Sequence, residues 1–214
     1  MTGFTRKTLG FLDDLSAHND RDWFKDHKAI YEAEIKAPAL AFGDQTAAAL
    51  EAMTGLTHTP KLFRIHRDVR FSKDKTPYNT HVHMSFAPDT GQETPPVWMF
   101  GLGLKNLSLG VGIFGFGKQM LEDFRARVVG ADGAKIAAML RDLEASGARI
   151  SEPALKRVPA GYDKDHPHAE LLRYKGIAAW RDLDRSAAIG DDLPDRTVAE
   201  FTSMRPLFDY LRGV

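Results

Sequence analysis

The stretches HVHMSFA (residues 81–87), VWMFGLGL (97–104) and NLSLGVGIF (106–114) decide the fold. Each combines alternating apolar side chains with β-branched or aromatic residues, and short segments rich in Gly, Pro, Asn or Asp separate them. This pattern is typical of antiparallel strands joined by hairpins. The preceding stretch KLFRIHRDVRF (61–71) shares these features, so we expect it to pair with residues 81–87.

Helical periodicity flanks these strands on both sides. Before them, apolar residues recur at helical spacing after the candidate N-caps Asn19 and Asp20, and Pro38 suits the first turn of a further helix. After them, we expect helices around 120–128, 136–143, 198–204 and 207–211, a short helix at 167–174 and a strand at 177–183. Gly147 is the expected C-cap of the second of these helices. The order predicts an α+β fold, with a central antiparallel sheet of consecutive hairpins flanked by N- and C-terminal helices, in a single domain over residues 1–214.

Composition restricts the classes of function. The chain has no cysteine, which excludes disulfides, thiol catalysis and Cys-ligated zinc or iron–sulfur sites. Its 29 Lys and Arg balance 29 Asp and Glu, which argues against nucleic acid or an anionic membrane as the partner. Residues 1–19 lack the apolar core of a signal peptide, and no stretch has the roughly 20 apolar residues of a membrane span. We therefore expect a soluble, cytoplasmic protein.

Charged residues are densest between Arg64 and Tyr78. If 61–71 is a strand, alternate side chains share a face, which places four apolar residues on the core side, namely Phe63, Ile65, Val69 and Phe71. The opposite face then carries Arg64, His66, Asp68 and Arg70. With 72–79 as the connecting loop, pairing would bring Arg70 near His81 and Asp68 near His83. Arg67 departs from this scheme unless a bulge shifts the register.

Arginine presents a planar fork of donors that fits phosphate and carboxylate groups, so this segment predicts a site for a small anionic ligand. Two alternatives stay open. Asp68 and Asp74 could simply neutralise neighbouring cations on a solvated face. A two-histidine, one-carboxylate metal site would instead use His66, Asp68, His81 and His83, although the nearby arginines oppose a bound cation.

Three motifs resemble one family across nearly the whole chain. They are Arg67-Asp68-x-Arg70-Phe71-Ser72-Lys73-Asp74-Lys75-x-Pro77-Tyr78, the N-terminal Phe11-Leu12-x-x-Leu15 with Asn19-x-x-x-Trp23-Phe24 and Tyr31-Glu32, and Lys156-Arg157-x-Pro159-x-Gly161-Tyr162 followed by His166-Pro167. Together they are similar to the family catalogued as domain of unknown function 2461. The resemblance implies an architecture and a set of motif residues, and no reaction.

The second basic motif, Lys156 and Arg157, would line a cationic pocket if it folded back over the hairpin. The expected ligand-binding residues are therefore Arg64, Arg67, Asp68, Arg70, Lys73, Lys75, Tyr78, Lys156 and Arg157. Three kinds of function fit the sequence: a domain that binds, with or without catalysis, a small anionic ligand on the sheet, a metal-dependent enzyme using the His/Asp cluster, or a non-catalytic protein-interaction module. We rank them in that order.

Overall fold

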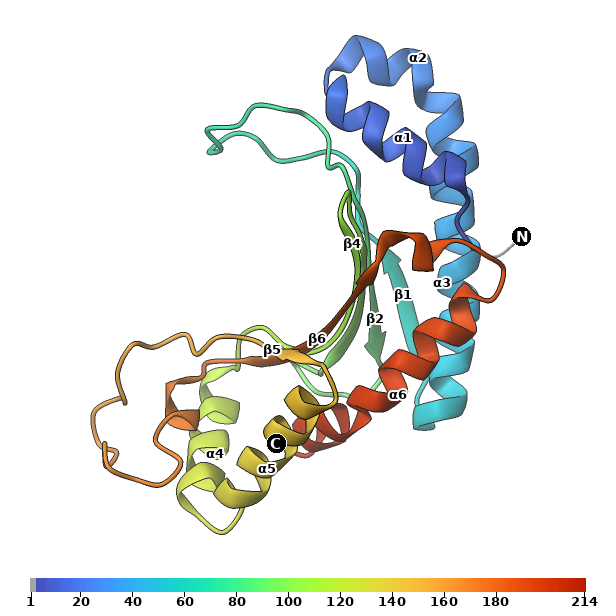
Figure 1. Ribbon diagram of the computed structural model, residues 1–214. Helices are drawn as coiled ribbons and strands as arrows, with labels where there is room; N and C mark the ends of the chain where they lie inside the picture. Colours follow the sequence, from blue (N-terminus) through green and yellow to red (C-terminus); the bar gives the residue numbers. More distant parts are fainter. Residues whose placement is uncertain (1–2) are drawn as a thin grey trace.

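Antiparallel strands build a single curved sheet in the computed structural model, which describes residues 3–214 (Figure 1). Within these residues the sheet has six strands in the order β1-β2-β3-β4-β6-β5. Their bounds are β1 (His58–Leu62), β2 (Val82–Pro88), β3 (Val97–Leu102), β4 (Asn106–Ile113), β5 (Arg149–Ile150) and β6 (Ile177–Asp184). β2, β3 and β4 follow one another as hairpins, which confirms the predicted α+β class.

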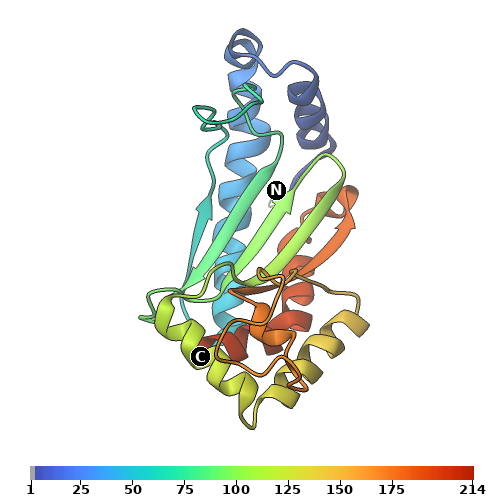
Figure 2. The same ribbon diagram turned by 90° about the vertical axis from the view of Figure 1, so that its left-hand side faces the viewer.

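Two long helices, α3 (Ala37–Thr54) and α6 (Leu193–Arg212), cover one face of the sheet (Figure 1). The apolar residues that alternate along the strands point toward these helices, so Phe86, Trp98 and Phe100 are fully buried. Trp98 packs between two phenylalanines of α6, at 4.9 Å between ring centroids in each case. The sheet–helix layer is the hydrophobic core, and within residues 3–214 no long helix covers the opposite, concave face of the sheet (Figure 2).

The N-terminal helices extend beyond one end of the sheet. α1 (Arg6–Ala17) leads into α2 (Arg21–Tyr31), which continues through one π-helical turn, η1 (Glu32–Lys36), into α3. Asp20 caps α2 by accepting a hydrogen bond from the Trp23 amide at 2.9 Å, as predicted. Asn19, the other predicted N-cap, instead binds Tyr78. Pro38 lies in the first turn of α3 and does not interrupt the path of the chain.

The C-terminal half adds α4 (Lys118–Val129), α5 (Gly133–Ala145), η2 (Leu171–Arg173) and η3 (Arg185–Ala188). Gly147 has φ 92° just past α5, in agreement with its predicted capping role. The two helices expected at 198–204 and 207–211 are one helix, α6, which accommodates Pro206 in its interior. The two-residue strand β5 was not predicted, because so short a segment carries no periodicity. Among the described residues, no helix combines the length and the apolar character that a bilayer span needs.

The strand predicted over 61–71 is wrong in its bounds. β1 occupies His58–Leu62, and residues 63–81, which we call the arm, project from the end of the sheet without regular structure (Figures 1 and 2). The side chains of this segment that were predicted to face the core therefore differ in their exposure to solvent. Ile65 is 7% exposed, whereas Phe63 is 47% and Phe71 is 95% exposed. The arm leaves the sheet because its polar side chains bind its own main chain, as described below.

Candidate functional site

The concave face of the sheet carries a groove of about 520 Å³. Alternate residues of β2, β3 and β4 point into it, since their neighbours in the chain point into the core. Its apolar lining includes Phe63, Val97, Met99, Phe114 and Trp180. Its polar lining consists of His81, His83, Ser85, Asn106 and Ser108. The groove thus combines an apolar floor with a few polar groups, which is the usual composition of a small-molecule site.

Two stacked histidines belong to the polar lining of the groove. The rings of His81 and His83 stack at 3.7 Å between centroids. The ring of His83 also lies over Gly101, where an added Cβ would come within 3.2 Å of Nε2. Burial and the neighbouring His81 lower the pKa of His83 to about 4, and burial together with Arg67 lowers the pKa of His81. Both imidazoles are therefore neutral at pH 7, and each can donate one hydrogen bond and accept another.

A hydrogen-bonded network lies beside the histidines on β4, β5 and β6. Asp182 accepts from the Ser108 hydroxyl, from the Asn106 amide at 3.2 Å and from the Arg149 guanidinium at 3.0 Å. Burial acts to raise the pKa of Asp182, but the hydrogen bonds from Ser108 and Arg149 outweigh it and lower this pKa. The carboxylate is ionised and fully engaged, so it holds Asn106 and Ser108 in fixed positions at the edge of the groove.

Arg67 holds the arm together. Its Nη1 donates to Asp74 Oδ2 at 2.7 Å, to the Thr76 carbonyl at 3.0 Å and to the Thr76 hydroxyl. The Arg67 amide also donates to the Pro77 carbonyl at 2.8 Å. Asp74 accepts from the Thr76 amide, and this bond together with Arg67 lowers the pKa of Asp74 to about 2. These contacts give Arg67 and Asp74 a structural role within the arm.

The outer part of the arm is also internally paired. Asp68 accepts from Arg70 at 2.9 Å and 2.7 Å, and Lys75 Nζ donates to the Val69 carbonyl at 2.9 Å. The predicted pairing of Arg70 with His81 and of Asp68 with His83 is wrong. The observed pairing joins His66 to Tyr78, because β1 ends at Leu62 and the register is set by Leu62 opposite Met84.

Tyr78 and Asn19 attach the arm to the N-terminal helices. The Asn19 side chain pairs with the main chain of Tyr78 in both directions, at 2.9 Å to the carbonyl and 3.0 Å from the amide. The Tyr78 ring is 6% exposed and stacks on Phe24 at 4.1 Å. Asn79 adds a bond from its side chain to the Arg64 carbonyl at 3.2 Å. Tyr78, predicted as a ligand-binding residue, thus anchors the base of the arm.

The remaining predicted cations lie in two places. Within residues 3–214, Arg64 and Lys73 form no ion pair at hydrogen-bonding distance, and both are exposed on the arm. The second motif, with Lys156 and Arg157, lies in the segment 151–176 at the opposite end of the concave face from the arm (Figures 1 and 2). The expectation that this motif folds back over the first hairpin is therefore wrong, because the concave face of the sheet separates the two segments (Figure 1).

The four candidate metal ligands do not assemble. His66 packs edge-on against Tyr78, Asp68 is paired with Arg70, and His81 stacks with His83. In the part of the chain that the structure describes, no group of three or more His, Asp or Glu side chains is placed to hold a metal ion. The predicted His/Asp cluster depended on the register of a strand that ends before His66.

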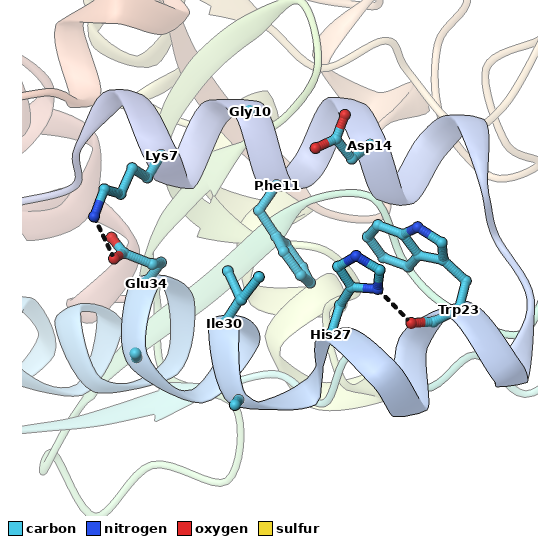
Figure 3. A pocket seen from close by; sticks show the side chains of 10 residues that line it. Lys7, Gly10, Phe11, Asp14, Trp23, His27, Ile30 and Glu34 are labelled. Carbon is cyan, nitrogen blue, oxygen red and sulfur yellow. Dashed lines mark hydrogen bonds and ion pairs between the residues drawn. The ribbon is translucent and has the colours of Figure 1, made fainter.

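A second groove, of about 590 Å³, lies between α1 and α2 (Figure 3). Phe11 from α1 and Ile30 from α2 point into it, and the ion pair between Lys7 and Glu34 closes one end at 3.4 Å. At the other end, Trp23 stacks on His27 at 4.0 Å between ring centroids. Two residues of the N-terminal family motif, Phe11 and Trp23, line this groove, and their rings lie 5.7 Å apart between α1 and α2.

The most informative residues of the concave groove were missed by sequence reasoning. The sequence pattern predicts strands that contain Met99, Asn106, Ser108 and Trp180. It does not by itself indicate that the face opposite the core forms a groove. The signal was present, since the alternation that buries Trp98 and Phe100 necessarily turns Met99 and Gly101 to the other side.

We expect Arg67→Ala to destabilise the protein by about 1–3 kcal/mol, because it removes charge-assisted bonds that close the arm. Chemical denaturation followed by circular dichroism measures the loss. Arg70→Ala is the matched control, and its unfolding midpoint should not change, because Arg70 and its partners Asp68 and Phe71 are all exposed. The pKa of His81 should also rise in Arg67→Ala alone. Equal destabilisation by both variants would contradict the structural role of Arg67.

Comparison with known proteins supports the family resemblance that the sequence motifs indicate. None of the curated proteins compared with the chain matches it. The family model described as conserved hypothetical protein (DUF2461) matches residues 7–210, which include most of α1 and α6, the arm and the six strands of the described sheet. The chain therefore belongs to the DUF2461 family.

Proposed function

We propose that the concave face binds a small organic ligand that carries both a planar apolar part and a phosphate or carboxylate group. The observation that carries this proposal is the uncovered apolar floor of the sheet. Helices α3 and α6 bury one face, whereas Phe63, Met99 and Trp180 line an open groove on the other. Its volume of about 520 Å³ lies within the range of roughly 300–1,000 Å³ for small-molecule sites.

The anionic part of the ligand is supported by the charges on the β1 side of the groove. Residues 64–75 contain five cations and two carboxylates. Arg67 and Arg70 are occupied by Asp74 and Asp68, so Arg64 and Lys73 are the arm cations proposed to meet a ligand. Lys61 of β1 adds a further ammonium group, which lies 5.1 Å from the ring centroid of Phe63. The other motif residues support the site by shaping the arm.

A protein-interaction role is the second candidate, and one observation favours it. Phe71 is 95% exposed on the arm, beside Arg70 and close to Lys73. A large apolar side chain held in solvent on an internally bonded segment is typical of a contact with another protein. A partner that binds wild type but not Phe71→Ala, with ligand binding in the groove unchanged, would support this second role.

A thermal-shift screen tests the proposed site. The panel contains nucleotides, sugar phosphates, aromatic carboxylates and dicarboxylates. A ligand at a hundred times its dissociation constant adds about 2.7 kcal/mol, which corresponds to roughly 5–10 °C for a chain of this size. We expect at least one compound with both a ring and an anionic group to give such a shift.

Two matched variants locate the effect. Ser85→Phe fills the floor of the concave groove without changing charge, and Ile30→Phe adds the same ring to the groove between α1 and α2. The shift should disappear in Ser85→Phe and persist in Ile30→Phe. Loss of the shift in Ile30→Phe alone, or no shift with any compound of the panel, would count against a ligand site on the concave face.

A further inference from the structure

Trp180 presents a flat aromatic surface to the concave groove. Trp180 pairs with Gly110 across β4 and β6, and its indole lies directly on that glycine. A Cβ at position 110 would come within 2.4 Å of Cε3 and 2.7 Å of Cδ2, so only glycine lets the ring lie so close to the strand. One face of the indole is therefore supported by the backbone. Trp180 is partly exposed and lines the groove together with Phe114, whose ring is tilted by 41° at 6.1 Å between centroids, so the indole keeps an open part on which a planar ring could stack.

Hydrogen-bonding groups of both kinds lie next to this surface. Ser108 is two residues from Gly110 on β4, and His83 extends toward it across Gly101. The neutral imidazole of His83 can donate and accept, and Asn106 has its amide nitrogen bound to Ser108 at 3.0 Å, which leaves its carbonyl oxygen as an acceptor. Such a set matches the edge of a nitrogen heterocycle, which presents N–H donors beside ring-nitrogen or carbonyl acceptors.

Cationic side chains lie at the other end of the same row. The residues opposite one another across the sheet are Trp180, Gly110, Met99, Ser85 and Lys61. All of them face the groove side, and four strand spacings separate Lys61 from Trp180, or roughly 19 Å. Arg64 is exposed on the arm, three residues after Lys61 in the chain. A ligand that touched both ends would need a ring at one end and extended negative charge at the other.

We propose that the concave face binds a nucleoside polyphosphate, with its base stacked on Trp180 and its phosphates directed along the sheet toward Lys61 and Arg64. This inference rests on the proposed function and names its ligand class. The span favours a di- or triphosphate, since a nucleoside monophosphate is too short to reach from the indole to the Lys61 ammonium. An aromatic carboxylate would stack on the Trp180 indole without reaching Lys61 or Arg64.

Isothermal titration calorimetry with ATP, AMP, adenosine and inorganic tripolyphosphate tests the two ends separately. We expect ATP to bind at least about tenfold more tightly than AMP, and adenosine or tripolyphosphate alone to bind weakly. Trp180→Leu should reduce the affinity for ATP about tenfold, the effect of losing one stacking contact. Trp23→Leu, in the groove between α1 and α2, is the matched control and should leave ATP binding unchanged.

Lys61→Gln keeps the test independent of any folding defect at position 180, because Lys61 is exposed at the edge of the sheet. This variant should weaken ATP binding severalfold and leave adenosine binding unchanged. Equal binding of tripolyphosphate and ATP, or loss of ATP binding in Trp23→Leu, would overturn the inference. Failure of all nucleotides, while an aromatic carboxylate still binds and is blocked by Ser85→Phe, would overturn the nucleotide class and leave the proposed function standing. Failure of every compound would reject both.

Discussion

Phe42→Ala should destabilise the protein by about 3–5 kcal/mol, whereas Phe71→Ala should change the free energy of unfolding by no more than about 0.5 kcal/mol. Phe42 is fully buried on α3, and its ring lies 4.7 Å from that of Phe100 and 6.3 Å from that of Phe86. Its removal leaves a cavity between the helix and the sheet. Phe71 is 95% exposed, so the same truncation removes almost no buried surface.

Urea denaturation of the two variants measures this contrast directly, because the chemical change is identical and only the environment differs. The alternation in residues 61–71 predicts that Phe71 faces the core. If Phe71→Ala cost as much as Phe42→Ala, the arm would have to be a strand packed on the sheet, and the concave groove would then have a different lining.

Asn19→Ala should lower the free energy of unfolding by about 2–4 kcal/mol. The Asn19 amide is the partner of both the carbonyl and the amide of Tyr78, at 2.9 and 3.0 Å. Both bonds are partly buried, so both main-chain groups would lose their protein partner at a place where water replaces it only in part. The anchoring of the arm to the N-terminal helices would be lost with them.

Two further variants make this prediction specific. Asn19→Asp keeps the acceptor for the Tyr78 amide and loses the donor for the Tyr78 carbonyl. Its free energy of unfolding should therefore lie between those of Asn19→Ala and the wild type. Asn79→Ala removes one exposed bond to the Arg64 carbonyl and should cost about 0.5 kcal/mol or less. Thermal and chemical unfolding give the values. If Asn19→Ala lowered the free energy of unfolding by no more than Asn79→Ala does, the result would contradict the anchoring role of Asn19.

Much of the fold follows from local pattern. The strands β2, β3, β4 and β6 and the helices α4 and α5 lie where periodicity predicts them, because each buries one face against a contiguous core. The conformation of the arm is not predicted by the alternation of apolar residues. Its alternating apolar residues resemble a strand, but Arg67, Asp74 and Asn19 provide the main chain with hydrogen bonds that a neighbouring strand would otherwise supply.

The candidate site was predictable only in part. The prediction that His81 and His83 lie on one face of the strand and Val82 and Met84 on the other is confirmed, because successive side chains of a strand point to opposite faces. The partners of these histidines depended on register, and register depends on where β1 ends. Trp180 is remote in sequence and enters the groove only because β6 pairs with β4, a contact that no local signal reveals.

The concave face is tested most directly by the three indole N–H signals in a nitrogen–proton NMR spectrum. The tryptophans report on three places, with Trp180 in the concave groove, Trp98 in the core and Trp23 in the groove between α1 and α2. The titrant is the panel compound that gives the largest thermal shift, and Trp180→Phe and Trp23→Phe assign the signals. We predict that the Trp180 signal moves with saturation while those of Trp23 and Trp98 stay in place. A titration that moves Trp23 and leaves Trp180 unchanged would contradict a ligand site on the concave face.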